Sequence, residues 1–221
     1  MAPGRGERAG LAALLTAALC AVCGWGTACN CASQPSADPT GGAANGAPAQ
    51  RDPRWAAPIQ RPGLPNLHKL SDDLYRGAQP DDEGYPELKK MGIKTVLNLR
   101  SFHSGRSEAA EAGLDYETVP MSAWDPKDED AVAFLRLVGD PAKTPIFVHC
   151  QHGADRTGLI CAVYRVVIQG WNRDDALEEM AEGGFGFHGM WDGLPEYLRE
   201  LDVENLKERA GLTEHEPEGT E

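Results

Sequence analysis

A cysteine and an arginine six positions apart frame a loop that could act on a tetrahedral anion. Residues 145–148 form an apolar run typical of a buried strand, and a second apolar run, typical of a helix, starts at Thr157. The loop between them begins with Cys150 and ends with Arg156. The N–H groups of such a loop converge on one point, where the helix N-terminus adds partial positive charge. The spacing therefore predicts an anion site in front of Cys150.

Cys150 has the sequence surroundings of a nucleophile. A free cysteine has a pKa of about 8.5, and a helix N-terminus with a nearby cation lowers it to about 3.5–7.5, so we expect a thiolate at neutral pH. Arg156 can bind two oxygens of the anion in bidentate geometry, and Thr157 is placed to donate its hydroxyl to the sulfur. Phosphoryl transfer to a cysteine requires these groups. The alternative is a buried structural cysteine beside a helix start, which does not account for the spacing of the other residues.

The ten residues 149–158 (His-Cys-Gln-His-Gly-Ala-Asp-Arg-Thr-Gly) resemble the H-C-x5-R signature of the cysteine-based protein tyrosine phosphatase superfamily, in the form followed by Thr-Gly. Residues 75–80 (Tyr-Arg-Gly-Ala-Gln-Pro) and 96–100 (Val-Leu-Asn-Leu-Arg) are also similar to small bacterial dual-specificity-type phosphatases, exported ones among them. The resemblance covers roughly residues 67–201, and only the 149–158 segment is highly specific. It implies a single α/β domain with a mostly parallel central sheet flanked by helices.

The resemblance also implies which residues surround the substrate phosphate. They are Gln151, His152, Gly153, Ala154, Asp155 and Arg156. His149 precedes the nucleophile, and we expect it to orient the loop backbone rather than to transfer protons. Cys161 lies in the helix that follows, and we expect it to be a buried spacer rather than a redox partner of Cys150.

Hydrolysis of a phosphate monoester also needs an acid that protonates the leaving oxygen. In the family this acid is an aspartate on a loop some 25–35 residues before the cysteine, a place that Trp-Asp-Pro at 124–126 occupies, so the resemblance implies Asp125. Asp128 and Asp130 are alternatives, although each also suits the start of a helix. Asp155 is a further alternative, because some lipid phosphatases of the superfamily carry an aspartate there, but orienting a neighbouring side chain suits it better. The receptor-type enzymes have Trp-Pro-Asp instead, so the acid loop is not theirs.

The resemblance implies a phosphatase that hydrolyses phosphotyrosine, with phosphoserine and phosphothreonine as further substrates, through a phosphocysteine intermediate. An inositol-phosphate or phosphoinositide phosphatase is the alternative. Such family members usually carry lysines at the variable loop positions, where this chain has Gln151, His152, Ala154 and Asp155. A non-catalytic phosphate-binding module would typically lack the nucleophile. We expect no cofactor and no metal, because the histidines and cysteines show no paired ligand spacing.

The first 31 residues predict an export segment. Arg5 and Arg8 precede an apolar core over 11–22, which has the length of a signal-peptide core, whereas a membrane-spanning helix needs about 20 residues. Residues 26–29 (Gly-Thr-Ala-Cys) loosely resemble a lipoprotein cleavage box, and ordinary signal-peptidase cleavage nearby is the alternative. We therefore expect an exported protein of the periplasm or cell envelope, with a lipid anchor at Cys29 if the lipoprotein route applies.

Composition predicts three further regions. Residues 32–66 are rich in Ala, Pro and Gly and are expected to be a disordered linker; 67–210 form the phosphatase domain, and 211–221 an acidic flexible tail. Residues 1–66 carry five arginines and three acidic residues, so the net charge of −13 leaves −15 for the rest. Such a domain is a poor partner for nucleic acid or anionic lipid. We expect a monomer that acts on phosphorylated proteins or peptides.

The hydrophobic pattern predicts strands that alternate with helices. The expected strands are 67–75 (a strand or hairpin), 93–99, 114–119 and 145–148; the expected helices are 81–91, a short one within 100–112, 128–138, one from 157, 173–182 and 191 to about 209. This alternation predicts an α/β sheet covered on both faces.

Overall fold

The computed structural model describes residues 51–213. The predicted export segment, Cys29, the first part of the predicted linker and the last eight residues of the predicted tail lie outside this range. None of the helices within it is long and apolar enough to cross a membrane.

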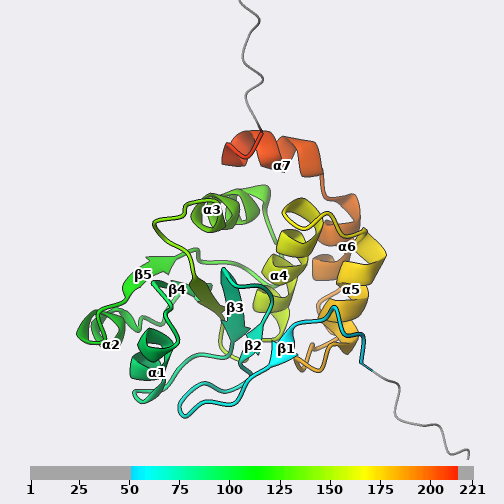
Figure 1. The fold of residues 1–221 in the computed structure, drawn as a ribbon. Coiled ribbons are helices and arrows are strands. Elements are labelled where there is room, and N and C mark those ends of the chain that lie inside the picture. Colours follow the sequence, from blue (N-terminus) through cyan, green and yellow to red (C-terminus); the bar gives the residue numbers. More distant parts are fainter. Residues whose placement is uncertain (1–50, 214–221) are drawn as a thin grey trace, which may run out of the picture. The chain divides into compact units, whose positions relative to one another are not determined.

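A six-stranded sheet runs through the domain (Figure 1). Its strands are β1 (Ala57–Pro58), β2 (His68–Lys69), β3 (Leu74–Gly77), β4 (Thr95–Asn98), β5 (Asp115–Thr118) and β6 (Ile146–His149). The spatial order is β1-β2-β3-β6-β4-β5, in which β3, β6, β4 and β5 are parallel and β1 and β2 are added antiparallel at one edge. The mostly parallel sheet that the sequence predicts is therefore confirmed, and the expected 67–75 segment is the β2–β3 hairpin.

Successive residues of the central strands pack into two different cores, one on each face of the sheet. In β6, Ile146 and Val148 join one core and Phe147 joins the other. In β4, Leu97 and Val96 divide in the same way, as the alternation of side chains along a strand requires. Both faces of these strands are therefore buried, which explains why they read as continuous apolar runs.

Seven helices lie in the described part of the chain, on both sides of the sheet (Figure 1). They are α1 (Gly84–Lys90), α2 (Arg106–Glu111), α3 (Asp128–Val138), α4 (Asp155–Val167), α5 (Arg173–Glu182), α6 (Gly193–Glu200) and α7 (Val203–Ala210). Side chains of α1 and α2 share one core, and side chains of α3 to α7 share the other. The bounds of α3 and α5 are those that the sequence predicts.

The helix predicted from 191 to about 209 is two helices. The chain leaves helical geometry at Leu201, whose ψ is 123°, and the carboxylate of Asp202 then accepts a hydrogen bond from the N–H of Asn205 at 3.0 Å. Asp202 is thus the N-cap of α7. The buried side chain of Leu201 holds this bend against the core, so the prediction of one continuous helix is wrong.

The predicted linker is folded from residue 51 onward. The N–H of the buried Ala56 donates to the carboxylate of Glu179 at 2.6 Å, and Arg54 forms an ion pair with Asp175 at 2.9 Å. Glu179 is itself buried and pairs with Arg165 at 2.6 Å. The predicted domain start at 67 is therefore too late, because residues 51–58 are attached to α5 by polar contacts that a Pro- and Gly-rich composition does not reveal.

The predicted tail also begins too early. Gly211 takes a left-handed conformation (φ 74°) that ends α7. The N–H of Leu212 donates to the carbonyl of Lys207 at 2.9 Å, and the Leu212 side chain packs against the core. Residues 211–213 therefore belong to the domain.

Candidate active site

The predicted anion site lies where three parallel strands end side by side. His149, the last residue of β6, is paired with Gly77 at the end of β3 and with Asn98 at the end of β4. The chain then turns through residues 150–154 and enters α4 at Asp155. Crevices at the carboxyl ends of parallel strands are the usual binding places of such sheets. We call residues 150–156 the phosphate loop.

Three successive carbonyl groups of the phosphate loop are held from outside. Their donors, in loop order, are the backbone N–H of Gln79 (3.2 Å), the side-chain amide of Asn66 (2.9 Å) and the guanidinium of Arg76 (2.7 Å), which bind the carbonyls of Gln151, His152 and Gly153. In a planar trans peptide the N–H points opposite to the C=O. The amides that follow these carbonyls are therefore turned toward the inside of the loop, where an anion would sit.

Gly153 makes the tight turn of the phosphate loop possible. Its φ is +70°, and a Cβ at this position would lie 2.4 Å from the carbonyl carbon and oxygen of Gly77. A Cβ essentially never lies that close to a non-bonded atom. Glycine is therefore required both by the backbone conformation and by the close approach of the loop to β3.

Cys150 is 3% exposed, and its surroundings favour the thiolate. Burial alone would raise the pKa of the thiol. The hydroxyl and the backbone N–H of Thr157 lower it, as do the charge of Arg156 and the N–H of Gly153, and the pKa falls below its ordinary value. Cys150 therefore has the electrostatic environment that the sequence predicts for a nucleophile.

The Thr157 hydroxyl lowers the pKa of the Cys150 thiol, although the two groups do not form a hydrogen bond of regular geometry. Thr157 is fully buried, and its Oγ1 has no partner of regular geometry within residues 51–213. Because the donor is not engaged elsewhere in that range, it is available to a negatively charged sulfur.

His149 is a neutral ring that orients the backbone, as the sequence predicts. Its pKa is lowered to about 4, because burial and the nearby charge of Arg100 outweigh the opposing effect of a hydrogen bond to the backbone of Cys150. The ring Nδ1 donates to the carbonyl of Cys150 at 3.0 Å. At neutral pH the ring therefore carries no charge beside the nucleophile.

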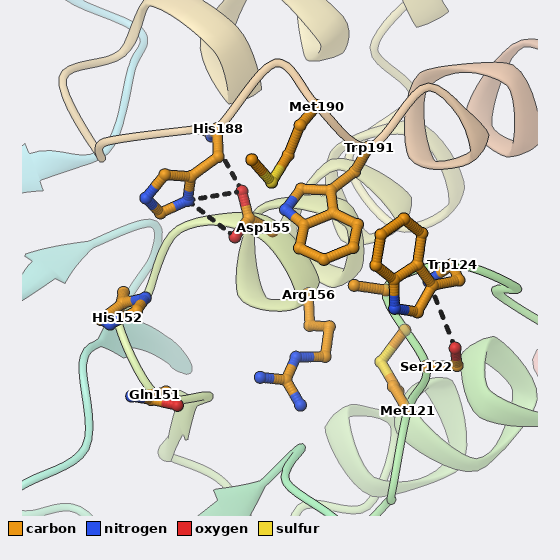
Figure 2. A pocket seen from close by; sticks show the side chains of 11 residues that line it. Met121, Ser122, Trp124, Gln151, His152, Asp155, Arg156, His188, Met190 and Trp191 are labelled. Carbon is orange, nitrogen blue, oxygen red and sulfur yellow. Dashed lines mark hydrogen bonds and ion pairs between the residues drawn. The ribbon is translucent and has the colours of Figure 1, made fainter.

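A cleft of about 450 Å³ opens in front of the phosphate loop. Its walls come from the loop itself, from residues 121–124 and from residues 188–191. Figure 2 shows Arg156 extending into the space between Gln151 and the indole of Trp124. Among the predicted phosphate-binding residues, Gln151, His152, Asp155 and Arg156 line the cleft, and Gly153 and Ala154 are buried in the loop behind it.

Asp155 orients its neighbour, which is the role that the sequence analysis favours for it. Its carboxylate accepts hydrogen bonds from the backbone N–H and the ring Nδ1 of His188, both at 2.9 Å (Figure 2). His188 follows a short segment in which Gly183 ends α5 and Phe185 is buried. The sequence analysis does not identify His188 as part of the cleft wall, where the structure places it.

The three candidate acids before the cysteine have different surroundings. Asp125 is 70% exposed and pairs with Lys127 at 2.9 Å, next to the part of its loop that lines the cleft. Asp128 accepts hydrogen bonds from Tyr197 at 3.0 Å and Arg209 at 3.2 Å, which attach α3 to α6 and α7.

Asp130 is partly buried, and this burial raises its pKa. None of the three aspartates lines the cleft in this structure.

Sequence reasoning missed the apolar wall of the cleft. Trp124 and Trp191 meet edge to face with 4.1 Å between ring centroids, and Met121 and Met190 lie beside them (Figure 2). The residues come from two loops that are far apart in the sequence, and no periodic pattern marks either loop. Their types, large and apolar within otherwise polar loops, were the only available signal.

Within residues 51–213, no group of three or more His, Cys, Asp and Glu side chains is arranged to hold a metal ion.

Residues 66–190 match the model of a family described as a DSP-PTPase phosphatase fused to NAD+ kinase. The chain is 35% identical to the dual specificity protein phosphatase TpbA of Pseudomonas aeruginosa over 160 residues. The aligned region covers 72% of this chain and 72% of TpbA. A crystal structure of a TpbA variant in complex with phosphotyrosine superimposes with a TM-score of 0.65, at 33% identity over 74% of this chain and 99% of that one. The chain is also 29% identical to the inositol diphosphatase DSP5 of Arabidopsis thaliana, over 52% of this chain and 60% of that protein.

We predict that Gly153→Ala weakens binding of an oxyanion such as tungstate by about tenfold or more, the value of one lost hydrogen bond to a charged group. The reason is that the added Cβ must displace the loop from Gly77. Gly170→Ala is the matched control, since Gly170 has a similar φ of +69° but no atom within 4 Å of the added Cβ. Isothermal titration of both variants, with urea unfolding as the fold check, gives the comparison. Equal tungstate affinity in the two variants would contradict the requirement for glycine at 153.

Proposed function

Because the chain belongs to the dual-specificity group of the cysteine-based protein tyrosine phosphatases, we propose that it hydrolyses phosphotyrosine in proteins or peptides, with phosphoserine and phosphothreonine as further substrates. The observation that carries the proposal is the pairing of Cys150, whose thiol pKa is lowered, with an amide-lined loop that ends in Arg156. A nucleophile, a set of preorganised donors and a planar cation then act on one phosphate group.

The first step transfers the phosphoryl group to the enzyme. The Cys150 thiolate attacks phosphorus, and the S–P bond forms while the bond from phosphorus to the ester oxygen breaks. Arg156 and the loop amides hold the three equatorial oxygens, where negative charge is concentrated in the transition state. Asp125 gives its proton to the ester oxygen, which leaves as an alcohol or phenol.

The second step releases inorganic phosphate. A water molecule attacks the phosphorus of phosphocysteine and gives a proton to the Asp125 carboxylate, which now acts as base. The S–P bond breaks, and the electron pair returns to Cys150 as a thiolate. The Thr157 hydroxyl stabilises this leaving thiolate by donating to it.

The apolar wall of the cleft supports an aromatic substrate. Trp124 and Met190 are 75% and 66% exposed, which is unusual for side chains of this size and type. Together with Trp191 they offer the ring of a phosphotyrosine an edge-to-face or stacked contact. Phosphoserine has no ring to fill this space, so we infer that it is the slower substrate.

Hydrolysis of an inositol phosphate is the second candidate, and it is supported by the likeness to a plant protein named as an inositol diphosphatase. The charges of the cleft favour the first candidate. Arg156 is the only lysine or arginine among the described residues that line the cleft, and Asp155 adds a negative charge beside it. A substrate with several phosphate groups would need more cations there than one.

The direct test compares kcat/KM for a phosphotyrosine peptide, the matching phosphothreonine peptide and an inositol pyrophosphate. We expect the phosphotyrosine peptide to give the highest value. Cys150→Ser should abolish turnover with all three and still bind tungstate, because the loop amides remain. A higher kcat/KM for the inositol pyrophosphate would favour the second candidate, and retained turnover by Cys150→Ser would exclude the covalent mechanism.

We predict that Asp125→Asn lowers kcat by about 10²–10⁴ for phenyl phosphate, the usual worth of general acid catalysis. The loss should shrink for a nitrophenyl ester, whose leaving group departs without a proton, and the pH–rate profile should change with it. Asp128→Asn is the matched control: it keeps an acceptor for Tyr197 but removes the ion pair with Arg209, so it should lower thermal stability more than kcat. A leaving-group-dependent loss in Asp128→Asn or Asp130→Asn, with normal Asp125→Asn, would assign the acid to that residue instead.

We further propose that the protein is exported, and this proposal rests on Arg5, Arg8 and the apolar core over 11–22. The mature protein is then expected outside the cytoplasm with its first residues removed. N-terminal sequencing and mass spectrometry of the protein from its native cells provide the measurement. An intact Met1 would contradict export, whereas a diacylated Cys29 at the new N-terminus would identify the lipoprotein route.

A further inference from the structure

Arg76 is a buried cation directly behind the phosphate loop. It lies in β3 and is 1% exposed. Its guanidinium lies 3.7 Å from the centre of the Phe185 ring on one side, and it donates to the carbonyl of Gly153 at 2.7 Å. A longer contact of 3.4 Å reaches the carbonyl of Ala154. An arginine in such a place must be compensated, because burial of a charge costs several kcal/mol unless it is paired.

No carboxylate among residues 51–213 forms an ion pair with Arg76. Both acceptors of its hydrogen bonds are loop carbonyls, and its Nε has no partner in this part of the chain. Glu179 acts on it from a distance, but the two oxygens of that carboxylate bind Arg165 at 2.6 and 2.7 Å. The charge of Arg76 is therefore not balanced by a carboxylate in contact with it.

Burial lowers the pKa of Arg76, whereas the negative charges of Cys161, Glu179 and Cys150, in decreasing order, raise it again and Arg165 lowers it. Burial raises the pKa of the Cys161 thiol to about 11, so this thiol is neutral at neutral pH. The remaining anion near Arg76 is the thiolate of Cys150, in the loop whose Gly153 carbonyl Arg76 binds. The same attraction must act on Cys150, because the interaction of two charges stabilises the charged form of both. An arginine guanidinium stays protonated in proteins, so its charge is present whenever the thiolate forms.

We propose that Arg76 is a positioning residue of the phosphate loop and the buried counter-charge of the Cys150 thiolate. Its hydrogen bond to the Gly153 carbonyl holds that carbonyl on the outside of the loop. Its positive charge stabilises the negative charge of the thiolate. The inference rests on the proposed function, since it concerns the same nucleophile, and it assigns a role to a residue outside the cleft. Phe185 completes the arrangement by covering the guanidinium with an aromatic face, an interaction that favours a cation.

The test measures the thiolate directly, as the pH dependence of Cys150 alkylation by iodoacetamide. Arg76→Gln removes the charge but keeps a hydrogen-bond donor, and we expect the apparent pKa of alkylation to rise by about one unit, at the lower end of the effect of an opposite charge. Arg76→Lys keeps the charge without the planar fork. It should leave this pKa nearly unchanged and weaken tungstate binding.

Asn66→Gly is the matched control in the same loop. Asn66 holds the neighbouring carbonyl of His152 without a charge, and its φ of 57° suits glycine. This variant should weaken tungstate binding, and it should raise the alkylation pKa less than Arg76→Gln does, because it loosens the Gly153 amide beside Cys150 without removing a charge. A purely structural role of Arg76 would instead shift the pKa equally in Arg76→Gln and Asn66→Gly, and that result would overturn the proposal.

Two further outcomes are also decisive. A folded Arg76→Gln variant, checked by thermal unfolding, with the wild-type alkylation pKa would overturn the counter-charge. If Arg76→Gln does not fold, the Arg76→Lys variant still tests the proposal. A rise of a full unit in its alkylation pKa would contradict the counter-charge, because this variant keeps the positive charge. Alkylation needs no phosphorylated substrate, so this readout remains valid even if the protein fails to hydrolyse phosphotyrosine.

Discussion

Backbone amides can face a common anion only where the carbonyl groups of the same peptides are satisfied on the opposite side. In this domain that condition is met by three donors of three different kinds: a main-chain N–H, a neutral amide and a guanidinium. All three come from the first strands and turns of the domain, whereas the loop comes from the last strand. The β3–β6 pairing, which sets Gly77 beside His149, is therefore what brings the donors and the loop together. The helices on both faces of the sheet shield these paired strands from water.

The electrostatics of the site are local. The chain from residue 67 onward carries a net charge of −15, which repels a phosphorylated substrate at long range. At physiological ionic strength such repulsion is screened beyond about 8 Å, and within the loop the substrate meets the partial positive charges of the amides and the full charge of Arg156. Binding therefore depends on short-range donors rather than on steering by the surface. A site of this kind gains selectivity for ligands that can enter fully, since an anion held at the rim feels mainly the acidic surroundings.

The nucleophile loop could be predicted because its information is local. The apolar strand, Cys150, the glycine turn and the helix start are contiguous, and each residue type has one physical role. The bounds of α3 and α5 were predictable for the same reason; Asn172, for instance, caps α5 by accepting from the N–H of Asp175. The start of the domain was not predictable in this way, because the N–H of Ala56 donates to a buried carboxylate more than 120 residues later.

The same distinction applies inside the site. In the sequence, Arg76 is one polar residue within a short predicted strand, and nothing local indicates a buried role. Only the fold shows that the two carbonyls it binds belong to a segment 77 or more residues further on. Trp191 carries no local signal either, because its contact with Trp124 is tertiary. The helix break at Leu201 was not predicted, although Asp202 is a residue type that often begins a helix as its N-cap. The apolar residues before and after Asp202 keep the spacing of one helix, so the pattern gave no sign of an interruption.

Phe185 connects the entry point of the domain to its catalytic loop. Its ring is contacted by Arg76 from below the loop and, at 5.8 Å, by the guanidinium of Arg51. Arg51 also donates to the carbonyls of Ala56 and Gly183, at 2.5 and 3.1 Å. The first described residue and the guanidinium behind the nucleophile therefore share one aromatic neighbour. A substitution at Phe185 would disturb the start of the domain and the support of the phosphate loop together.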